Sequence, residues 1–171
     1  MWSRTQLHHQ ALRAGTLAIA LCALGSAGYG QRGPGGPFAG LGGSWSGSGS
    51  LRLQDGGTER VRCRATYAVG EGGAALHQNL RCASDSYRFD LNSNVIYQGG
   101  AISGSWSETT RNVQGGLSGR ASAGQIDARV DGPGFAANLA LTTRGDRQNV
   151  SIASAGTELA SVAITLTRGS Q

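Results

Sequence analysis

Apolar and polar residues alternate almost without a break after residue 43, and short glycine-containing turns interrupt the alternation at intervals. A period of two is typical of β-strands that bury one face and expose the other. In residues 44–53, for example, Trp45 and Leu51 share one parity, while serines and Arg52 occupy the other. The pattern predicts an all-β domain. A helical bundle or coiled coil is excluded, because either would need helical periodicity and far more helix-forming residues.

Two of the three cysteines fix the register of one hairpin. The segments 59–69 and 75–83 are the second and third expected strands, and Cys63 and Cys82 lie on their inward parities. If the two cysteines face each other, every inward residue of one strand meets an inward residue of the other, which a shift by one residue would prevent. We therefore expect a Cys63–Cys82 disulfide, which would stabilise the fold by about 3 kcal/mol.

The remaining turns extend the same arrangement to the end of the chain. Gly99 and Gly100 form one expected two-residue turn, and Ala123 and Gly124 form another. Counted in this way, residues 44–169 contain ten hairpin-linked strands in a single β domain. An even number lets the first and last strands pair antiparallel and leaves no open edge. The sequence predicts a ten-stranded antiparallel up-and-down barrel, with a two-sheet β-sandwich as the alternative, because periodicity alone does not show closure.

The first part of the chain has a different composition. Residues 1–27 combine arginines, an apolar run over 14–24 and small residues at the end, which is the pattern of a secretory signal peptide. The apolar run is shorter than the roughly 18 residues that a membrane-spanning helix needs. Residues 28–43 are rich in glycine and proline and predict a linker. We expect a periplasmic or secreted protein without a transmembrane segment after processing.

The formal net charge is +5, and every basic residue is arginine. Removal of the signal peptide would leave a mildly basic domain. Arginines gather on the outward parities of three neighbouring expected strands: Arg60, Arg62, Arg64, Arg81 and Arg88. Such a face predicts contact with an anionic envelope component, such as lipid headgroups. The alternative is a solvated face balanced by nearby acids. Nucleic acid is not an expected partner, because the charge is small and the aromatic residues point inward.

The segment from Gly43 to Gly49 reads GSWSGSG. Its Gly43-x-Trp45 resembles the first-strand motif of lipocalins, and Trp45-x-Gly47-x-Gly49 resembles the first strand of nitrobindin-like barrels. The resemblance implies a calycin-like barrel that holds a small ligand, which in the nitrobindin type is haem bound through a histidine near the C-terminal end. No histidine follows His77 in this chain.

The inward parities supply aromatic and polar side chains that would line a cavity: Trp45, Tyr67, Gln78, Tyr87, Phe89, Tyr97, Trp106, Phe135 and Gln148. The same residues would also fit a filled core. We hypothesise non-catalytic binding of a small, largely apolar ligand in the barrel. The alternative is an envelope structural or interaction protein with a packed core and the arginine face outside.

The sequence offers little for catalysis or cofactor binding. His77 falls on an outward parity, and Glu108 is a single inward acid near a strand end. No nucleophile has a base beside it, and no two carboxylates form a pair. Haem held by a tyrosine instead of a histidine would have to use Tyr67, Tyr87 or Tyr97, for which nothing specific argues. We therefore expect no enzyme activity, no metal site and no cofactor.

Overall fold

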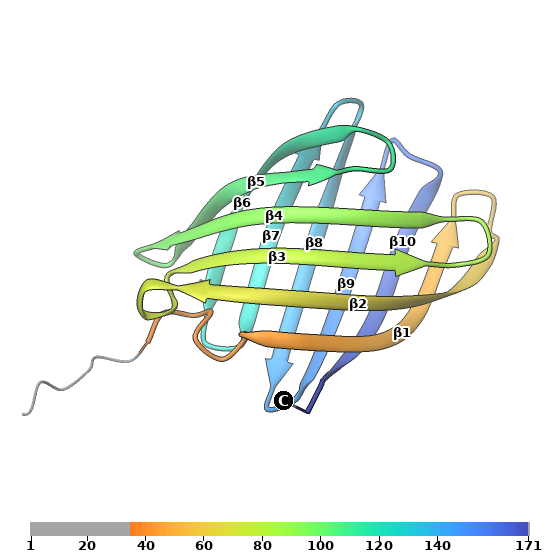
Figure 1. The fold of residues 1–171 in the computed structure, drawn as a ribbon. Coiled ribbons are helices and arrows are strands. Elements are labelled where there is room, and N and C mark those ends of the chain that lie inside the picture. The colour runs from red at the N-terminus through yellow and green to blue at the C-terminus, as the bar shows by residue number, and fades with distance from the viewer. Residues whose placement is uncertain (1–34, 171) are drawn as a thin grey trace, which may run out of the picture. The chain divides into compact units, whose positions relative to one another are not determined.

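Ten antiparallel strands close into a barrel in the computed structural model, which describes residues 35–170 apart from the side chain of residue 71 (Figure 1). The strands are β1 (Gly43–Leu53), β2 (Thr58–Gly70), β3 (Ala75–Ala83), β4 (Arg88–Gln98), β5 (Ala101–Glu108), β6 (Val113–Ser122), β7 (Gln125–Gly132), β8 (Phe135–Arg144), β9 (Arg147–Ala155) and β10 (Leu159–Arg168). A 3-10 turn, η1 (Glu71–Gly73), connects β2 to β3.

Pairing between β1 and β10 closes the barrel, so the predicted barrel is confirmed over the sandwich. In Figure 1, β2 to β5 cross the front of the view, and β7 to β10 run behind them at a steep angle. The predicted hairpins are also confirmed. Cys63 lies opposite Cys82 and forms a disulfide with it, Tyr97 lies opposite Ile102, and the turn after β6 has the expected register.

Inward glycines stand where neighbouring strands approach too closely for a side chain. A Cβ added at Gly49 would lie 1.9 Å from the Ala163 carbonyl oxygen on β10. One added at Gly104 would lie 2.0 Å from the Asn94 carbonyl oxygen on β4. Both contacts are far shorter than van der Waals distance. These glycines therefore allow the wall to curve sharply, which accounts for part of the high glycine content.

The end of the expected linker packs against the barrel. The side chains of Phe38 and Leu41 are 0% and 2% exposed. The backbone N–H of Phe38 donates to the Gly73 carbonyl at 3.1 Å, and the Trp45 indole N–H donates to the Leu41 carbonyl at 2.8 Å. Glycine and proline content predicted a linker over 28–43. Two apolar side chains within it are enough to anchor residues 36–42 across one end of the barrel.

The expected signal peptide, residues 1–27, and residues 28–34 lie outside the described part of the chain. Between residues 35 and 170, no helix is long and apolar enough to cross a bilayer. The Cys63–Cys82 bond is of the kind that persists in oxidising compartments. Export to the periplasm or beyond stays a prediction.

Candidate functional site

One end of the barrel is sealed around Trp45, which is 1% exposed. The guanidinium of Arg168, the last residue of β10, lies over the Trp45 ring at 4.3 Å from its centroid. The same guanidinium donates hydrogen bonds to the carbonyls of Gly40 and Gly42 and pairs with Asp146 at 3.0 Å. Arg168 thereby ties β10, Trp45 and the segment before β1 into a closed floor.

Above this floor, a chain of polar side chains crosses the interior. The Tyr67 hydroxyl on β2 donates to Gln148 Oε1 on β9 at 2.8 Å, and Gln148 Nε2 donates to the Thr143 hydroxyl at 3.1 Å. Burial raises the pKa of Tyr67 well above its usual range, so the hydroxyl stays protonated and acts as a donor. Tyr67 and Gln148, both predicted to line a cavity, are thus part of a hydrogen-bonded layer above the floor.

Two inward leucines of β3 and β4 are less buried than the residues nearer the floor on the same strands. On β3, Leu76 near the floor is 5% exposed, whereas Leu80 is half-buried. On β4, Val95 near the floor is 7% exposed, whereas Leu91 is half-buried. Leu80 and Leu91 lie directly opposite each other. Other inward side chains at this end are buried, among them Leu51, Val61 and Trp106 as well as both cysteines of the disulfide.

Aromatic side chains gather at this second, open end. The rings of Tyr87 and Phe89 are stacked with their centroids 6.2 Å apart, and the Arg111 guanidinium lies 5.0 Å from the centroid of Phe89. Trp106 on β5 and Phe135 on β8 meet with their centroids 5.5 Å apart. The structure therefore brings four predicted lining residues together as two pairs.

The other predicted lining residues lie between the two ends or near the floor. Gln78 lies between Tyr67 and Ser93 in the register of the neighbouring strands. Ser93 donates to Gln78 Oε1 at 3.2 Å. Tyr97 is half-buried near the sealed end, where it packs against the core.

Glu108, the inward acid at the end of β5, has a structural role at the open end. Its carboxylate accepts hydrogen bonds from the backbone N–H groups of Asp90, Thr110 and Arg111 at 2.8–3.0 Å and from the Thr110 hydroxyl. Burial raises the pKa of Glu108, but these hydrogen bonds lower it more, so the net pKa lies below its usual value. Glu108 holds the turn after β5 and is not a free acid at the rim.

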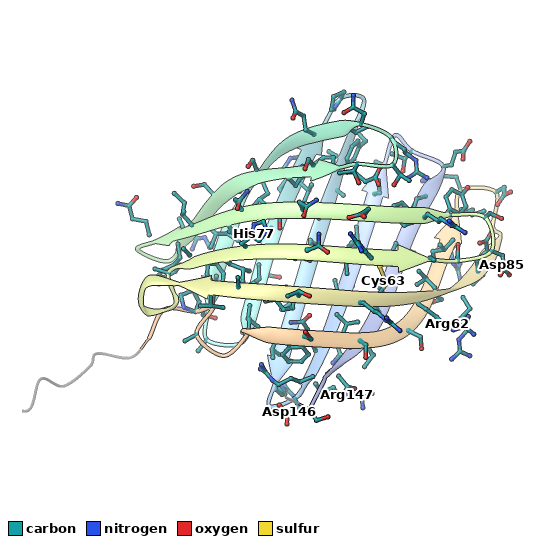
Figure 2. The ribbon with its side chains drawn as sticks, in the orientation of Figure 1. Arg62, Cys63, His77, Asp85, Asp146 and Arg147 are labelled. Carbon is teal, nitrogen blue, oxygen red and sulfur yellow. A yellow bond between two sulfur atoms is a disulfide. The ribbon has the colours of Figure 1, made fainter. Side chains whose placement is uncertain are left out.

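The described residues do not fit the haem site that the nitrobindin resemblance implies. His77 lies on the outer wall, where its Nδ1 is 2.8 Å from Asn94 Oδ1 (Figure 2). The hydroxyl of Tyr67 is used by Gln148, and that of Tyr87 donates to Glu158 at 3.2 Å. Across residues 35–170, no three His, Cys, Asp or Glu side chains lie close enough together to hold a metal ion.

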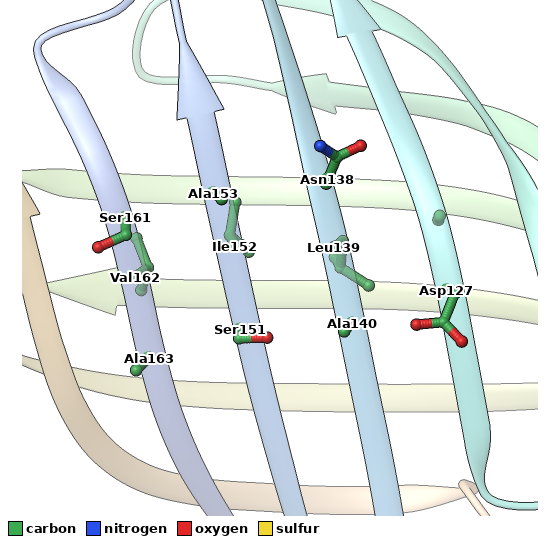
Figure 3. Close-up of a pocket in the computed structure, with 11 residues that line it drawn as sticks. Asp127, Asn138, Leu139, Ala140, Ser151, Ile152, Ala153, Ser161, Val162 and Ala163 are labelled. Carbon is green, nitrogen blue, oxygen red and sulfur yellow. The ribbon is translucent and has the colours of Figure 1, made fainter.

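The outer wall carries a shallow hollow that the sequence analysis did not anticipate (Figure 3). It has a volume of about 670 Å³, lies over β7 to β10, and is lined by small outward side chains such as Ala140, Ser151 and Ala163. A second hollow of about 390 Å³ adjoins it toward β1. The small outward residues on adjacent strands were the only feature of the sequence that could have indicated this hollow. Its depth depends on the curvature of the sheet, which the sequence pattern does not give.

The predicted arginines share the outer wall of β2, β3 and β4. Arg64 lies directly opposite Arg81, whose guanidinium pairs with Asp90 at 3.0 Å. Arg62 and its neighbour Cys63 occupy opposite faces of β2 (Figure 2). Among the described residues, four members of this arginine face form no ion pair: Arg60, Arg62, Arg64 and Arg88.

No protein-family model matches the chain, and no curated protein matches it. Solved structures with the same fold exist. The S-type phycobiliprotein lyase CPES from Guillardia theta has a TM-score of 0.61 and 12% identity, covering 78% of this chain and 91% of its own. Rv2717c from M. tuberculosis has a TM-score of 0.60 and 13% identity, covering 77% of this chain and 94% of its own. These likenesses show the fold alone.

Proposed function

We propose that the protein binds a small, largely apolar ligand inside the barrel and catalyses no reaction on it. The observation that carries the proposal is the incomplete burial of two inward leucines on β3 and β4. Leu76 and Val95 are buried near the sealed end, whereas Leu80 and Leu91 stay half-buried further along the same strands. Inward leucines of a filled core would lose nearly all contact with water. We infer that unfilled space lies beside them.

The size of the barrel supports the same proposal. Barrel diameter grows with strand number, and a barrel of about eight strands is either filled by its side chains or just wide enough for one small ligand. This barrel has ten strands, and several inward positions carry only an alanine, including Ala121, Ala128 and Ala137. The fold shared with a phycobiliprotein lyase is compatible with this use of the interior.

A non-catalytic role fits the state of the titratable groups. Glu108 is fully engaged by the turn after β5, and the hydroxyl of Tyr67 is held protonated by burial. His77 faces away from the interior. None of these groups is both free of a hydrogen-bond partner within the protein and accessible from the interior, as acid–base or nucleophilic catalysis requires.

A space-filling substitution tests ligand binding. Leu91→Trp is expected to weaken binding of the neutral fluorescent probe N-phenylnaphthylamine at least about tenfold, because an indole would occupy the inferred space. Fluorescence titration of the purified protein measures the effect. Ser105→Trp, on the outer wall of β5, is the matched control and should bind like the wild type. Equal affinity in both variants, or no binding to the wild type, would contradict the proposal.

The arginine face supports a second candidate function, contact with an anionic lipid surface of the cell envelope. The specific observation is that Arg64 lies directly opposite Arg81. Like charges at opposite positions of a sheet repel each other and destabilise it. Among these arginines, Asp90 forms an ion pair only with Arg81 and so balances only that charge. An anionic surface would relieve the remaining repulsion and match the charge of the whole face.

Charge reversal tests this second function. Arg62→Glu with Arg64→Glu is expected to abolish co-sedimentation with vesicles that contain phosphatidylglycerol, and salt should weaken wild-type binding. Arg144→Glu with Arg147→Glu reverses the same charge at the turn between β8 and β9 and serves as the control. Unchanged vesicle binding by the first double variant would refute the candidate.

A further inference from the structure

Two glutamines face the interior, and they differ in how their amides are used. Gln148 is 0% exposed, accepts from Tyr67 and donates to Thr143. Gln78, on the inward parity of β3, accepts from Ser93 through Oε1 at 3.2 Å. Its Nε2 forms no hydrogen bond with any residue from 35 to 170. The two N–H donors of Gln78 are therefore unused by the described protein.

This unused amide is in contact with open space. In the described part of the chain, every side-chain nitrogen or oxygen that is shielded from water has a hydrogen-bond partner. Because Gln78 is half-buried and its Nε2 lacks such a partner, that nitrogen retains accessible surface. Gln78 lies on the same face of β3 as Leu76 and Leu80. Its donors are thus available on the inner wall, one step closer to the floor than Leu80.

The described inner wall beside Gln78 carries polar and apolar side chains but no charged ones. Among the described strands, charged side chains on inward parities occur only near strand ends, at Glu59, Glu108 and Arg168. Each of them is already hydrogen-bonded or ion-paired within the protein. A charged ligand group that entered the barrel would lose its hydration without meeting an opposite charge, which is costly. A neutral acceptor would lose less hydration and would gain hydrogen bonds from the amide.

We propose that Gln78 is the polar anchor of the interior site, an inference that rests on the proposed function. The ligand is then an uncharged, mainly apolar molecule with a carbonyl-type hydrogen-bond acceptor. The amide donates to the acceptor, while Leu80 and Leu91 contact the apolar body. Ser93 fixes the orientation of the anchor, because it occupies Gln78 Oε1 and leaves Nε2 free for the ligand.

Three related fluorescent probes test this assignment on the full domain. They are the dimethylaminonaphthalene ketone prodan, its analogue with the carbonyl reduced to a methylene group, and the corresponding carboxylate. We expect the wild type to bind the ketone most tightly and the carboxylate most weakly. Gln78→Leu should weaken ketone binding about tenfold, the value of one or two hydrogen bonds, and leave the methylene analogue unchanged. The emission of bound ketone should also shift to the blue.

Gln114→Leu, an equivalent change on the outer wall of β6, is the matched control and should alter none of these affinities. Circular dichroism establishes that each variant folds. Equal loss of ketone and methylene binding in Gln78→Leu would overturn the anchor role while leaving the interior site intact, as would tighter binding of the carboxylate by the wild type. Failure of the wild type to bind any of the three probes would overturn both this inference and the proposed function.

Discussion

Trp45→Ala is expected to lower the free energy of unfolding by about 3–5 kcal/mol, the usual cost of truncating a fully buried large aromatic residue. The substitution removes the surface on which Arg168 lies and the indole N–H that holds the Leu41 carbonyl. It would also leave a void in the core cluster that contains Phe38 and Leu41. Denaturant titration followed by circular dichroism measures the loss.

Ile96→Ala is the control for the Trp45 substitution. Ile96 is a large apolar residue on β4 but is 58% exposed, so its truncation should change stability by less than about 0.5 kcal/mol. A loss of below about 1 kcal/mol in Trp45→Ala would contradict the view that this residue closes the barrel.

Loss of the Cys63–Cys82 bond is expected to cost about 3 kcal/mol, because the bond closes a loop with a sequence separation of 19 and so restricts the unfolded chain. The measurement compares denaturant midpoints of the wild type with and without reductant. The double variant Cys63→Ala with Cys82→Ala should resemble the reduced wild type. Reductant should have no effect on the double variant, and an unchanged wild-type midpoint under reduction would rule out the disulfide as a source of stability.

The strands and their register followed from the sequence because both depend on local rules. A period of two assigns each residue to a face, and a short turn fixes which residues oppose each other. That is why the Cys63–Cys82 and Tyr97–Ile102 pairs agree with the structure. Closure could only be inferred from an even number of strands. The pairing of β1 with β10 places Trp45 opposite Arg168, which explains the contact between the two side chains.

Other parts of the candidate site depend on contacts that the alternation of apolar and polar residues does not predict. Residues 36–42 have no alternation, so the burial of Phe38 against the sealed end was not visible in a glycine-rich segment. The partners of Glu108 are mainly backbone N–H groups, which every sequence has and which only the turn geometry aims at the carboxylate. The free amide of Gln78 likewise emerges only when the partners of its neighbours are known.

We propose that a small, largely apolar molecule occupies the barrel. Native mass spectrometry of the protein isolated gently from its own source tests it most directly. We predict an added mass of one small molecule per chain, which organic extraction removes and which Leu91→Trp does not carry. Spectra of the unliganded chain alone, together with failure of the extracted protein to take up any neutral apolar probe, would contradict the claim.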